Sequence, residues 1–224
     1  MYLYALSSNP FAASAKIVAK SEGVFSGEVY ADALAELEGF EIIWHIKDGE
    51  FFISGNVLAE IKGTSHTLLK IERTLLNMVL HSSSISTYTN SFVKRIEPYG
   101  TKLLDTRKTR PLLRVFEKYA TRCGGAVNHR MGLDDSLMIK DTHLKTIKNL
   151  KEYIAKARKK IPFTAKIEVE AETFEIACEA MQAGSDIVMC DNMISNQIFE
   201  IVKFRDENFP HVLLEASGNI SLET

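Results

Sequence analysis

The sequence predicts an α/β protein in two parts, and two observations lead to that fold class. Residues 1–95 mix short strand-like runs with one long helical stripe, whereas residues 96–224 alternate short apolar runs with helical segments. Such alternation is typical of parallel strands joined by crossover helices. Charged residues follow the apolar runs, as at the carboxyl ends of the strands in a β/α barrel. We therefore expect a small α/β domain over residues 1–95 and a β/α barrel domain over residues 96–224.

The first part should contain four short strands and two helices. The strands are expected at 15–19, 41–46, 51–53 and 57–61, with an Asp-Gly turn at 48–49, and a short helix at 29–37 ends at Gly39. A long helix begins near Ser65, because Leu68, Ile71 and Leu75 start a wide apolar stripe. The three serines at 82–84 should interrupt or bend this helix before it resumes over 87–96.

The second part should contain five parallel strands. Their apolar runs lie at 102–104, 137–139, 166–169, 186–189 and 212–214. Charged or polar residues stand at or just past the end of each run: Asp105 with Arg107 and Lys108, then Lys140, Glu168 with Glu170, Asp191, and Glu215 with Ser217. Because parallel strand ends share one face of a barrel, these side chains should meet in one site.

Composition favours a soluble cytoplasmic enzyme. The 224 residues are 46% hydrophobic, enough for one large core or a large and a small one. A formal net charge of -2 argues against binding nucleic acid through bulk charge. No apolar stretch is long enough to cross a membrane. The three cysteines (Cys123, Cys178 and Cys190) are odd in number and lack metal-ligand or CxxC spacing, which favours reduced thiols in the cytosol.

The cations between residues 103 and 140 are denser than a solvated surface requires. Arginine matches carboxylate and phosphate geometry with a planar fork, whereas lysine is a compact point charge. The mixture predicts a small anion that carries both carboxylates and phosphates. Arg107 and Lys108 precede Pro111, so this turn should open a helix whose amides would also face the anion. The alternative is a solvated basic turn.

The other polar residues suggest separate roles. His129 and Arg130 lie in a Gly-rich loop, from Gly124-Gly125 to Gly132, whose glycines would let the backbone approach a ligand. Binding is favoured over proton transfer for His129. Lys140 could stabilise a developing anion or form a Schiff base, and its alternative is an ion pair with Asp141. Glu168 and Glu170 share one face of a strand and form a carboxylate cluster with Asp191. Such a cluster could hold Mg²⁺, ribose hydroxyls or a developing positive carbon, or only balance charge.

The turn Ser217-Gly218-Asn219 follows the last apolar run. A Ser-Gly turn that enters a helix at this edge of a barrel is a common phosphate cradle.

An ordered set of short motifs resembles a known family. The motifs are Glu72-Arg73-Thr74, Asp105-Thr106-Arg107-Lys108-Thr109, Glu117-Lys118-Tyr119, Asn128-His129-Arg130, Ile139-Lys140-Asp141, Glu168-Val169-Glu170, Asp191-Asn192 and Glu215-Ala216-Ser217-Gly218. Together they closely resemble the quinolinate phosphoribosyltransferases, also called nicotinate-nucleotide pyrophosphorylases, over essentially the whole chain. The resemblance implies an N-terminal α/β sandwich and an open β/α barrel. It also implies a step of NAD synthesis, in which quinolinate and phosphoribosyl pyrophosphate give nicotinate mononucleotide, pyrophosphate and carbon dioxide.

The resemblance also implies roles for individual residues. Quinolinate would be bound by Arg107, His129, Arg130 and Lys140, with Arg73 donated from a neighbouring subunit of a homodimer or a hexamer. Phosphoribosyl pyrophosphate and its Mg²⁺ would face Lys108, Glu170 and Asp191, and its 5′-phosphate would meet Ser217 and Gly218, next to Asn219, where many members have glycine. Compared with the family, the chain is expected to be trimmed at both ends, with an incomplete barrel at its C-terminus.

Two other interpretations stay open at this point. A Schiff-base lyase on the same barrel would use Lys140 covalently. A non-catalytic or repurposed homologue, such as those associated with molybdate transport, would keep the fold without converting quinolinate.

Overall fold

The computed structural model describes residues 9–223. The chain divides into two compact units, Met1–Met131 and Gly132–Thr224, each with its own core. A domain boundary near residue 95 stays a prediction, because in this division the first unit continues beyond that residue as far as Met131.

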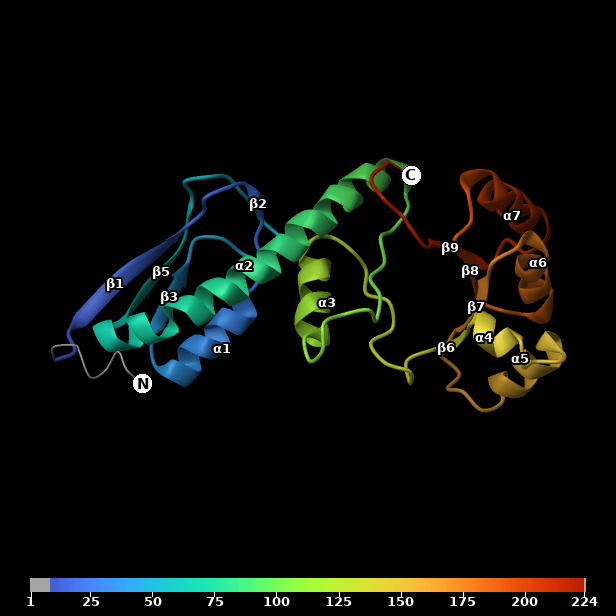
Figure 1. The fold of residues 1–224 in the computed structure, drawn as a ribbon, viewed down its shortest axis with the longest axis horizontal. Helices are drawn as coiled ribbons and strands as arrows, with labels where there is room; N and C mark the ends of the chain where they lie inside the picture. Colours follow the sequence, from blue (N-terminus) through green and yellow to red (C-terminus); the bar gives the residue numbers. More distant parts are fainter. Residues whose placement is uncertain (1–8, 224) are drawn as a thin grey trace. The chain divides into compact units, whose positions relative to one another are not determined.

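The first unit packs helices against small antiparallel sheets (Figure 1). Its strands are β1 (Ala12–Val18), β2 (Gly23–Val24), β3 (Glu41–Trp44), β4 (Phe51–Phe52) and β5 (Val57–Thr64), paired in the orders β1-β5-β3 and β2-β4. Its helices are α1 (Glu28–Glu38), α2 (Ser65–Ile96), the short 3-10 helix η2 (Glu97–Tyr99) and α3 (Arg114–Cys123). The predicted strands and the helix that ends at Gly39 are confirmed, and Gly39 has the left-handed conformation expected of a helix cap.

Helix α2 runs without interruption through the three serines, so the predicted break there is wrong. Ser82, Ser83 and the nearby Ser86 make hydrogen bonds to the segment around β2, whereas Ser84 bonds within its own helix. Ser83 Oγ accepts from the Ser26 amide at 3.1 Å, and the Ser82 and Ser26 hydroxyls lie 2.7 Å apart. Ser86 donates to the Val24 carbonyl at 2.6 Å. Ser86 also donates to the Ser83 carbonyl of its own helix at 3.1 Å, and the helix continues past all of these serines.

Helix α3 is joined to α1 through the predicted turn at Asp48. Asp48 Oδ1 accepts hydrogen bonds from the amides of Gly27 and Glu28 at 2.7 and 3.2 Å, so it caps the start of α1 from a distance. The Tyr119 hydroxyl of α3 donates to Asp48 Oδ2. Burial and the Asp48 carboxylate raise the pKa of Tyr119, so the phenol stays protonated and can donate.

Helix α3 ends against α2 at Gly124. A Cβ atom at this position would lie 2.5 Å from the Ser86 carbonyl oxygen and 2.6 Å from the Thr89 Cβ atom. Asn90 also donates to the Gly124 carbonyl at 3.2 Å. This glycine therefore serves close packing of two helices, and the interpretation that it lets the backbone approach a ligand is wrong.

We expect Gly124→Ala to lower the free energy of unfolding by about 1 to 3 kcal/mol, because an added methyl group must push α3 away from α2. Urea denaturation of the full chain measures the loss. Ser84→Ala is the control, since Ser84 is exposed on α2 and bonds only to its own helix. A Gly124→Ala protein as stable as the control would contradict this close approach.

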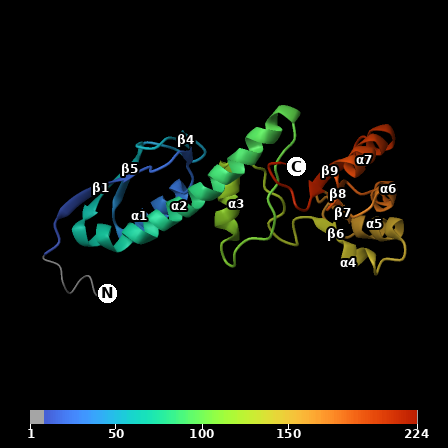
Figure 2. The ribbon, with the colours of Figure 1, turned by 45° about the horizontal axis from the view of Figure 1, so that its top comes forward.

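The second unit is a parallel sheet with helices on one side, as the two ribbon views agree (Figures 1 and 2). Its strands β6 (Leu137–Ile139), β7 (Ile167–Ala171), β8 (Ile187–Asp191) and β9 (Leu213–Ser217) lie in sequence order, connected by α4 (Asp141–Leu144), α5 (Leu150–Arg158), α6 (Phe174–Ala183) and α7 (Ser195–Asn208). Ile154, Met181 and Ile201 bring α5, α6 and α7 into its core. Four of the five predicted strands are confirmed.

The first predicted strand, at 102–104, is wrong. In the described part of the chain this run forms only an isolated parallel bridge, between Leu104 and Val127. Asp105 and Arg107 therefore follow an irregular segment of the first unit rather than a strand of the parallel sheet.

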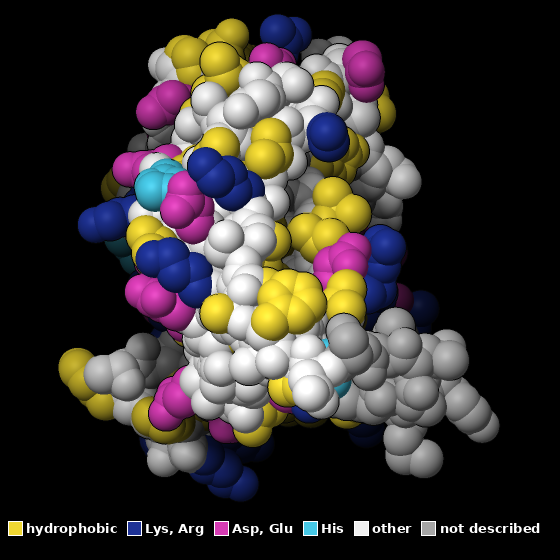
Figure 3. Space-filling model, turned by 90° about the vertical axis from the view of Figure 1, so that its left-hand side faces the viewer, with side chains coloured by type: hydrophobic (Ala, Val, Ile, Leu, Met, Phe, Trp, Pro, Cys, Tyr) yellow, Lys and Arg dark blue, Asp and Glu magenta, His cyan; other side chains and the backbone are white. Residues whose placement is uncertain are grey.

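The cysteines are unpaired and the surface charges are mixed, as the composition suggested. All three cysteines are free, and burial raises the pKa of Cys190 to about 11. Among the described helices, none is long and apolar enough to cross a membrane. On the face drawn in Figure 3, cationic and anionic side chains are interspersed. That face lacks the single-sign patch that a nucleic-acid backbone would favour.

Candidate active site

The second unit places acidic side chains on the sheet face opposite the helix core. Side chains alternate along a strand, so Glu168 and Glu170 of β7 share one face, while Val169 between them packs into the core. Strand register continues this face from Glu170 through Met189 of β8 to Glu215 of β9. Buried carboxylates on a sheet face favour a polar function there over simple packing.

Lys140 stands directly after β6 and pairs with Glu170. Its Nζ donates to Glu170 Oε2 at 2.8 Å, and the two side chains are 46% and 10% exposed. The alternative partner Asp141 instead forms an ion pair with Lys145 at 3.5 Å. A half-exposed ammonium beside a nearly buried carboxylate can still reach an anionic ligand.

The ends of β8 and β9 are bound together next to this pair. The Asn192 amide donates to the Ser217 carbonyl at 2.9 Å, and Asn192 Nδ2 donates to Asp191 Oδ2 at 2.7 Å. Gly218 has φ +87°, and a Cβ there would lie 2.2 Å from Asn192 Oδ1. Asn219 has φ 53°, a left-handed conformation that glycine adopts easily and asparagine tolerates.

Glu170 and Asp191 suit a hard cation in chemical type. Both are carboxylates near the carboxyl edge of neighbouring strands, and Glu170 is held by Lys140. Carboxylate oxygen is the ligand that Mg²⁺ prefers in proteins, usually together with substrate phosphates and water. The residues therefore fit a magnesium ion that a phosphate-bearing substrate would share.

In the first unit, Lys108 lines a hollow of about 430 Å³. The hollow is bordered by Ile85, Asp105, Thr106, Lys108, Thr109, Arg110, Glu117, Lys118 and Thr121. The Lys108 amide donates to Thr106 Oγ1 at 3.0 Å, which tightens the turn. Helix α3 starts only at Arg114, so the prediction that this turn opens a helix is wrong.

Two other arginines near this turn have structural partners. Arg110 donates to Glu117 Oε1 at 2.7 Å, and its guanidinium also contacts His81. Burial tends to raise the pKa of Glu117, but the hydrogen bonds from Arg110 and His81 outweigh it and the pKa is lowered. Arg114 donates to the Met131 carbonyl at 3.1 Å. These contacts hold the loop, which leaves Arg107 and Lys108 as its candidate ligand-binding cations.

His129 is oriented by the main chain around it. The Arg130 amide donates to His129 Nδ1 at 2.8 Å, so in a neutral ring the proton is on Nε2. The His129 amide donates to Asp105 Oδ1 at 2.8 Å. This tautomer can donate a hydrogen bond to a ligand carboxylate, as the binding role expected from the sequence requires.

Asp105 and Lys118 form a buried pair that the sequence analysis missed. Their side chains are 6% and 1% exposed, and Lys118 Nζ donates to Asp105 Oδ1. Asp105 was expected to stand at a strand end among the ligand-facing charges, but its carboxylate is occupied by neighbouring residues instead. The only signal for Lys118 was its position in the resemblance, because a lysine in a short helix usually faces solvent.

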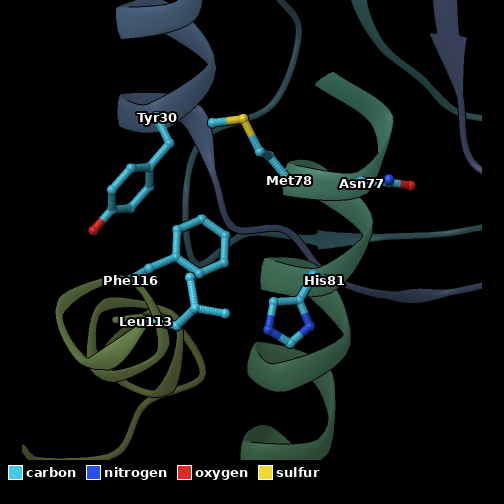
Figure 4. A pocket seen from close by; sticks show the side chains of 6 residues that line it. All are labelled: Tyr30, Asn77, Met78, His81, Leu113 and Phe116. Atoms are coloured by element: carbon cyan, nitrogen blue, oxygen red, sulfur yellow. The ribbon is translucent and has the colours of Figure 1, made fainter. Parts of the chain in front are cut away.

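A separate hollow of about 500 Å³ lies among α1, α2 and the start of α3 (Figure 4). Its lining residues are Tyr30, Asn77, Met78, His81, Leu113 and Phe116. The rings of Tyr30 and Phe116 meet edge to face with centroids 4.6 Å apart, and His81 stacks on Phe116. This mostly apolar lining does not suit a multiply charged anion, so the hollow is not a second substrate site.

Comparison with known proteins decides the family. The model for the quinolinate phosphoribosyl transferase N-terminal domain matches residues 1–83, and the model for the C-terminal domain of that family matches residues 85–224. The chain belongs to the quinolinate phosphoribosyltransferase family. The family resemblance read from the motifs is therefore confirmed, together with the expectation of a phosphoribosyltransferase fold and enzyme class.

Individual quinolinate phosphoribosyltransferases agree in sequence and in structure. A probable nicotinate-nucleotide pyrophosphorylase (carboxylating) from Bacillus subtilis is 42% identical over 212 residues, which are 94% of this chain and 72% of that protein. The human nicotinate-nucleotide pyrophosphorylase (carboxylating) is 33% identical over 98% of this chain and 74% of its own. The crystal structure of NadC from Streptococcus pyogenes superposes with a TM-score of 0.91, at 35% identity, over 100% of this chain and 79% of that one.

Proposed function

We propose that this chain converts quinolinate and phosphoribosyl pyrophosphate into nicotinate mononucleotide, pyrophosphate and carbon dioxide, a step of NAD synthesis. The observation that carries the proposal is the pair Lys140–Glu170, together with the adjacent ends of β8 and β9 at Asp191 and Gly218, in a chain of the quinolinate phosphoribosyltransferase family. A cation, two carboxylates and a glycine turn at neighbouring strand ends match the charges of both proposed substrates.

Quinolinate would be bound by cationic side chains and a histidine. The proposed ligands are Arg107, His129, Arg130 and Lys140. Arginine forks match the two carboxylates of the pyridine ring, and the Nε2 proton of His129 adds a directional donor. The dianion would lose its hydration shell on binding, and these fixed donors would replace it.

Phosphoribosyl pyrophosphate would be bound by Lys108, by Glu170 and Asp191 together with Mg²⁺, and by the turn at Ser217, Gly218 and Asn219. Magnesium bound to the pyrophosphate would neutralise part of its charge as it leaves. The turn would offer backbone amides to the phosphate, and glycine is required at position 218 because a Cβ there would collide with Asn192.

The reaction would proceed without a covalent enzyme intermediate. Bound quinolinate directs its ring nitrogen at the anomeric carbon, so positioning replaces a bimolecular encounter. As the bond to pyrophosphate breaks, positive charge develops on the ribose, and Glu170 and Asp191 stabilise it. Carbon dioxide then leaves the adjacent ring carbon, and the electron pair of the broken bond stays on that carbon, stabilised by the quaternised nitrogen and by the Lys140 ammonium. A proton from water at that carbon completes nicotinate mononucleotide.

We expect Glu170→Gln and Lys140→Ala each to lower kcat for nicotinate mononucleotide formation by about 100-fold or more, since each removes a charge aimed at the transition state. Chromatographic detection of the product measures the loss. Lys145→Ala is the matched control, because Lys145 is an exposed lysine on the same connection. Full activity of Glu170→Gln would contradict the proposed role of this carboxylate.

Two assays on the wild-type protein distinguish the proposed reaction from a Schiff-base lyase and from a repurposed homologue. Borohydride should not attach a carbonyl substrate to Lys140, and such trapping would favour a Schiff-base lyase. A repurposed homologue would bind a ligand without forming the nucleotide from quinolinate and phosphoribosyl pyrophosphate.

The broader context follows from the family and the composition. We propose that residues 1–95 form the α/β sandwich domain and that residues 96–224 are part of an open β/α barrel. The enzyme would be cytoplasmic. It would form a homodimer or a hexamer in which Arg73 of one subunit reaches the active site of a neighbouring subunit. Arg73 is exposed on α2 and makes no hydrogen bond or ion pair with the residues that the structure describes, so it is available to a second subunit. Trimming of the ends stays a prediction.

A further inference from the structure

The two substrate-binding segments of the first unit meet at one buried carboxylate. Asp105 immediately precedes the cationic turn that holds Arg107 and Lys108, and its Oδ1 accepts from the His129 amide at 2.8 Å. Lys118 Nζ also donates to Oδ1. The Asp105 side chain therefore links the start of the turn to the backbone of His129, a residue proposed to bind quinolinate.

The second oxygen of Asp105 extends this link. Asp105 Oδ2 accepts from Asn128 Nδ2 at 2.6 Å and from Thr121 Oγ1 at 3.2 Å. An ionised carboxylate accepts about four hydrogen bonds and donates none, so these four donors fill its capacity. An asparagine at position 105 could not reproduce the pattern, because its NH₂ group would face donors on whichever side it lies.

Helix α3 supplies the rest of the support. Asn128 Nδ2 also donates to the Lys118 carbonyl at 2.8 Å, and Arg114, one turn earlier, donates to the Met131 carbonyl. The segment from Asn128 to Met131 is thus held to α3 at both ends and to Asp105 in between. Its backbone position therefore depends on these contacts to α3 and to Asp105.

We propose that Asp105 is a positioning residue for quinolinate binding. It fixes the His129 backbone at a set distance from the turn of Arg107 and Lys108, and it forms a buried ion pair with Lys118. This role rests on the proposed function. It requires more of Asp105 than neutralising the charge of Lys118. Charge balance alone would need the ion pair but not the bonds to Asn128 and His129.

A pair of variants separates positioning from charge balance. Asp105→Asn leaves the Lys118 ammonium buried without its counterion, so it should unfold at lower temperature and raise the KM for quinolinate about 10- to 100-fold. The kcat at saturating quinolinate should change by less than about threefold, because Asp105 does not touch the reacting atoms. The double variant Asp105→Asn, Lys118→Met removes both charges and should regain much of the lost stability.

The double variant gives the deciding result. We expect its quinolinate KM to stay raised although its thermal stability recovers. A wild-type KM in the recovered double variant would overturn the proposal, because the pair would then act only through stability. Ser83→Ala is the control for a lost buried hydrogen bond in the same unit, and it should leave the KM unchanged.

Hydrogen exchange tests the same inference without substrate. In the ligand-free double variant, the His129 amide should exchange about tenfold faster or more than in wild type, and Ser83→Ala should not show this change. Equal exchange would overturn the positioning role. If wild type makes no nucleotide from the two substrates, the proposed function fails, and this exchange measurement alone decides the inference. If neither Asp105 variant folds, Asn128→Ala keeps the ion pair and should still speed exchange at His129.

Discussion

Replacing Arg107 by alanine should weaken quinolinate binding by about 2 to 4 kcal/mol, the range for leaving a buried charged group without its partner. Arg107 Nε is buried and has no hydrogen-bond partner among the described residues, whereas the nearby Arg110 is occupied by Glu117 and His81. A desolvated donor of this kind is stabilised when an anion arrives. Calorimetric titration of quinolinate into wild type and variant measures the difference.

Matched substitutions sharpen this result. Arg130→Ala should show a loss of similar size, and Arg107→Lys an intermediate one, because lysine keeps the charge but not the planar fork. Arg122→Ala makes the same change in net charge, yet Arg122 is exposed on α3 and lies over the Tyr119 ring, so quinolinate affinity should not change. Unchanged affinity in both Arg107→Ala and Arg130→Ala would contradict the assignment.

The parallel sheet could be predicted because each of its strands is recognisable from a short stretch of sequence. Each run is short and apolar, and a helix follows β6, β7 and β8, so burial on the helix side dictates the pattern. Strands β7 to β9 begin within about one residue of the prediction. The run at 102–104 has the same local pattern but only one bridge, to Val127. A strand needs a neighbour along its length, and no local pattern shows whether the chain returns to provide one.

Partners far apart in the sequence explain the other errors. The serines of α2 looked like a break, but Ser83 and Ser86 are satisfied by a segment about sixty residues earlier. Gly124 looked like a ligand-facing glycine and instead lets α3 approach α2. The conformational preference of a short sequence is overridden when residues far away in the chain provide hydrogen bonds or close packing.

The candidate site was predicted best where side-chain alternation and strand ends determine position. Lys140, Glu170 and Asp191 lie where those rules place them, at or near the carboxyl ends of β6, β7 and β8. Asp105 is a residue whose role its position in the sequence did not predict. Its charge suggested a ligand contact, but four donors that arrive from α3 and from the segment after it make it a buried support.

Mixing two inactive variants should restore activity if Arg73 completes the site of a neighbouring subunit. Arg73→Ala and Lys140→Ala should each lose most turnover as pure proteins. In a hybrid dimer, one site would combine the intact Lys140 of one subunit with the intact Arg73 of the other, while the second site would lack both. With random exchange half of the dimers are hybrids, so about one quarter of all sites should be active.

The size of the recovery distinguishes a shared site from a self-contained one. If both residues served the same subunit's site, every site in the mixture would lack one of them, and activity would stay at the level of the separate variants. Subunit exchange is verified by native mass spectrometry with one variant isotopically labelled. Lys145→Ala mixed with Lys140→Ala is the control, since it should give about half of wild-type activity whether or not sites are shared. Proven exchange without recovery by the Arg73→Ala and Lys140→Ala pair would contradict donation of Arg73, because the hybrid would then contain no complete site.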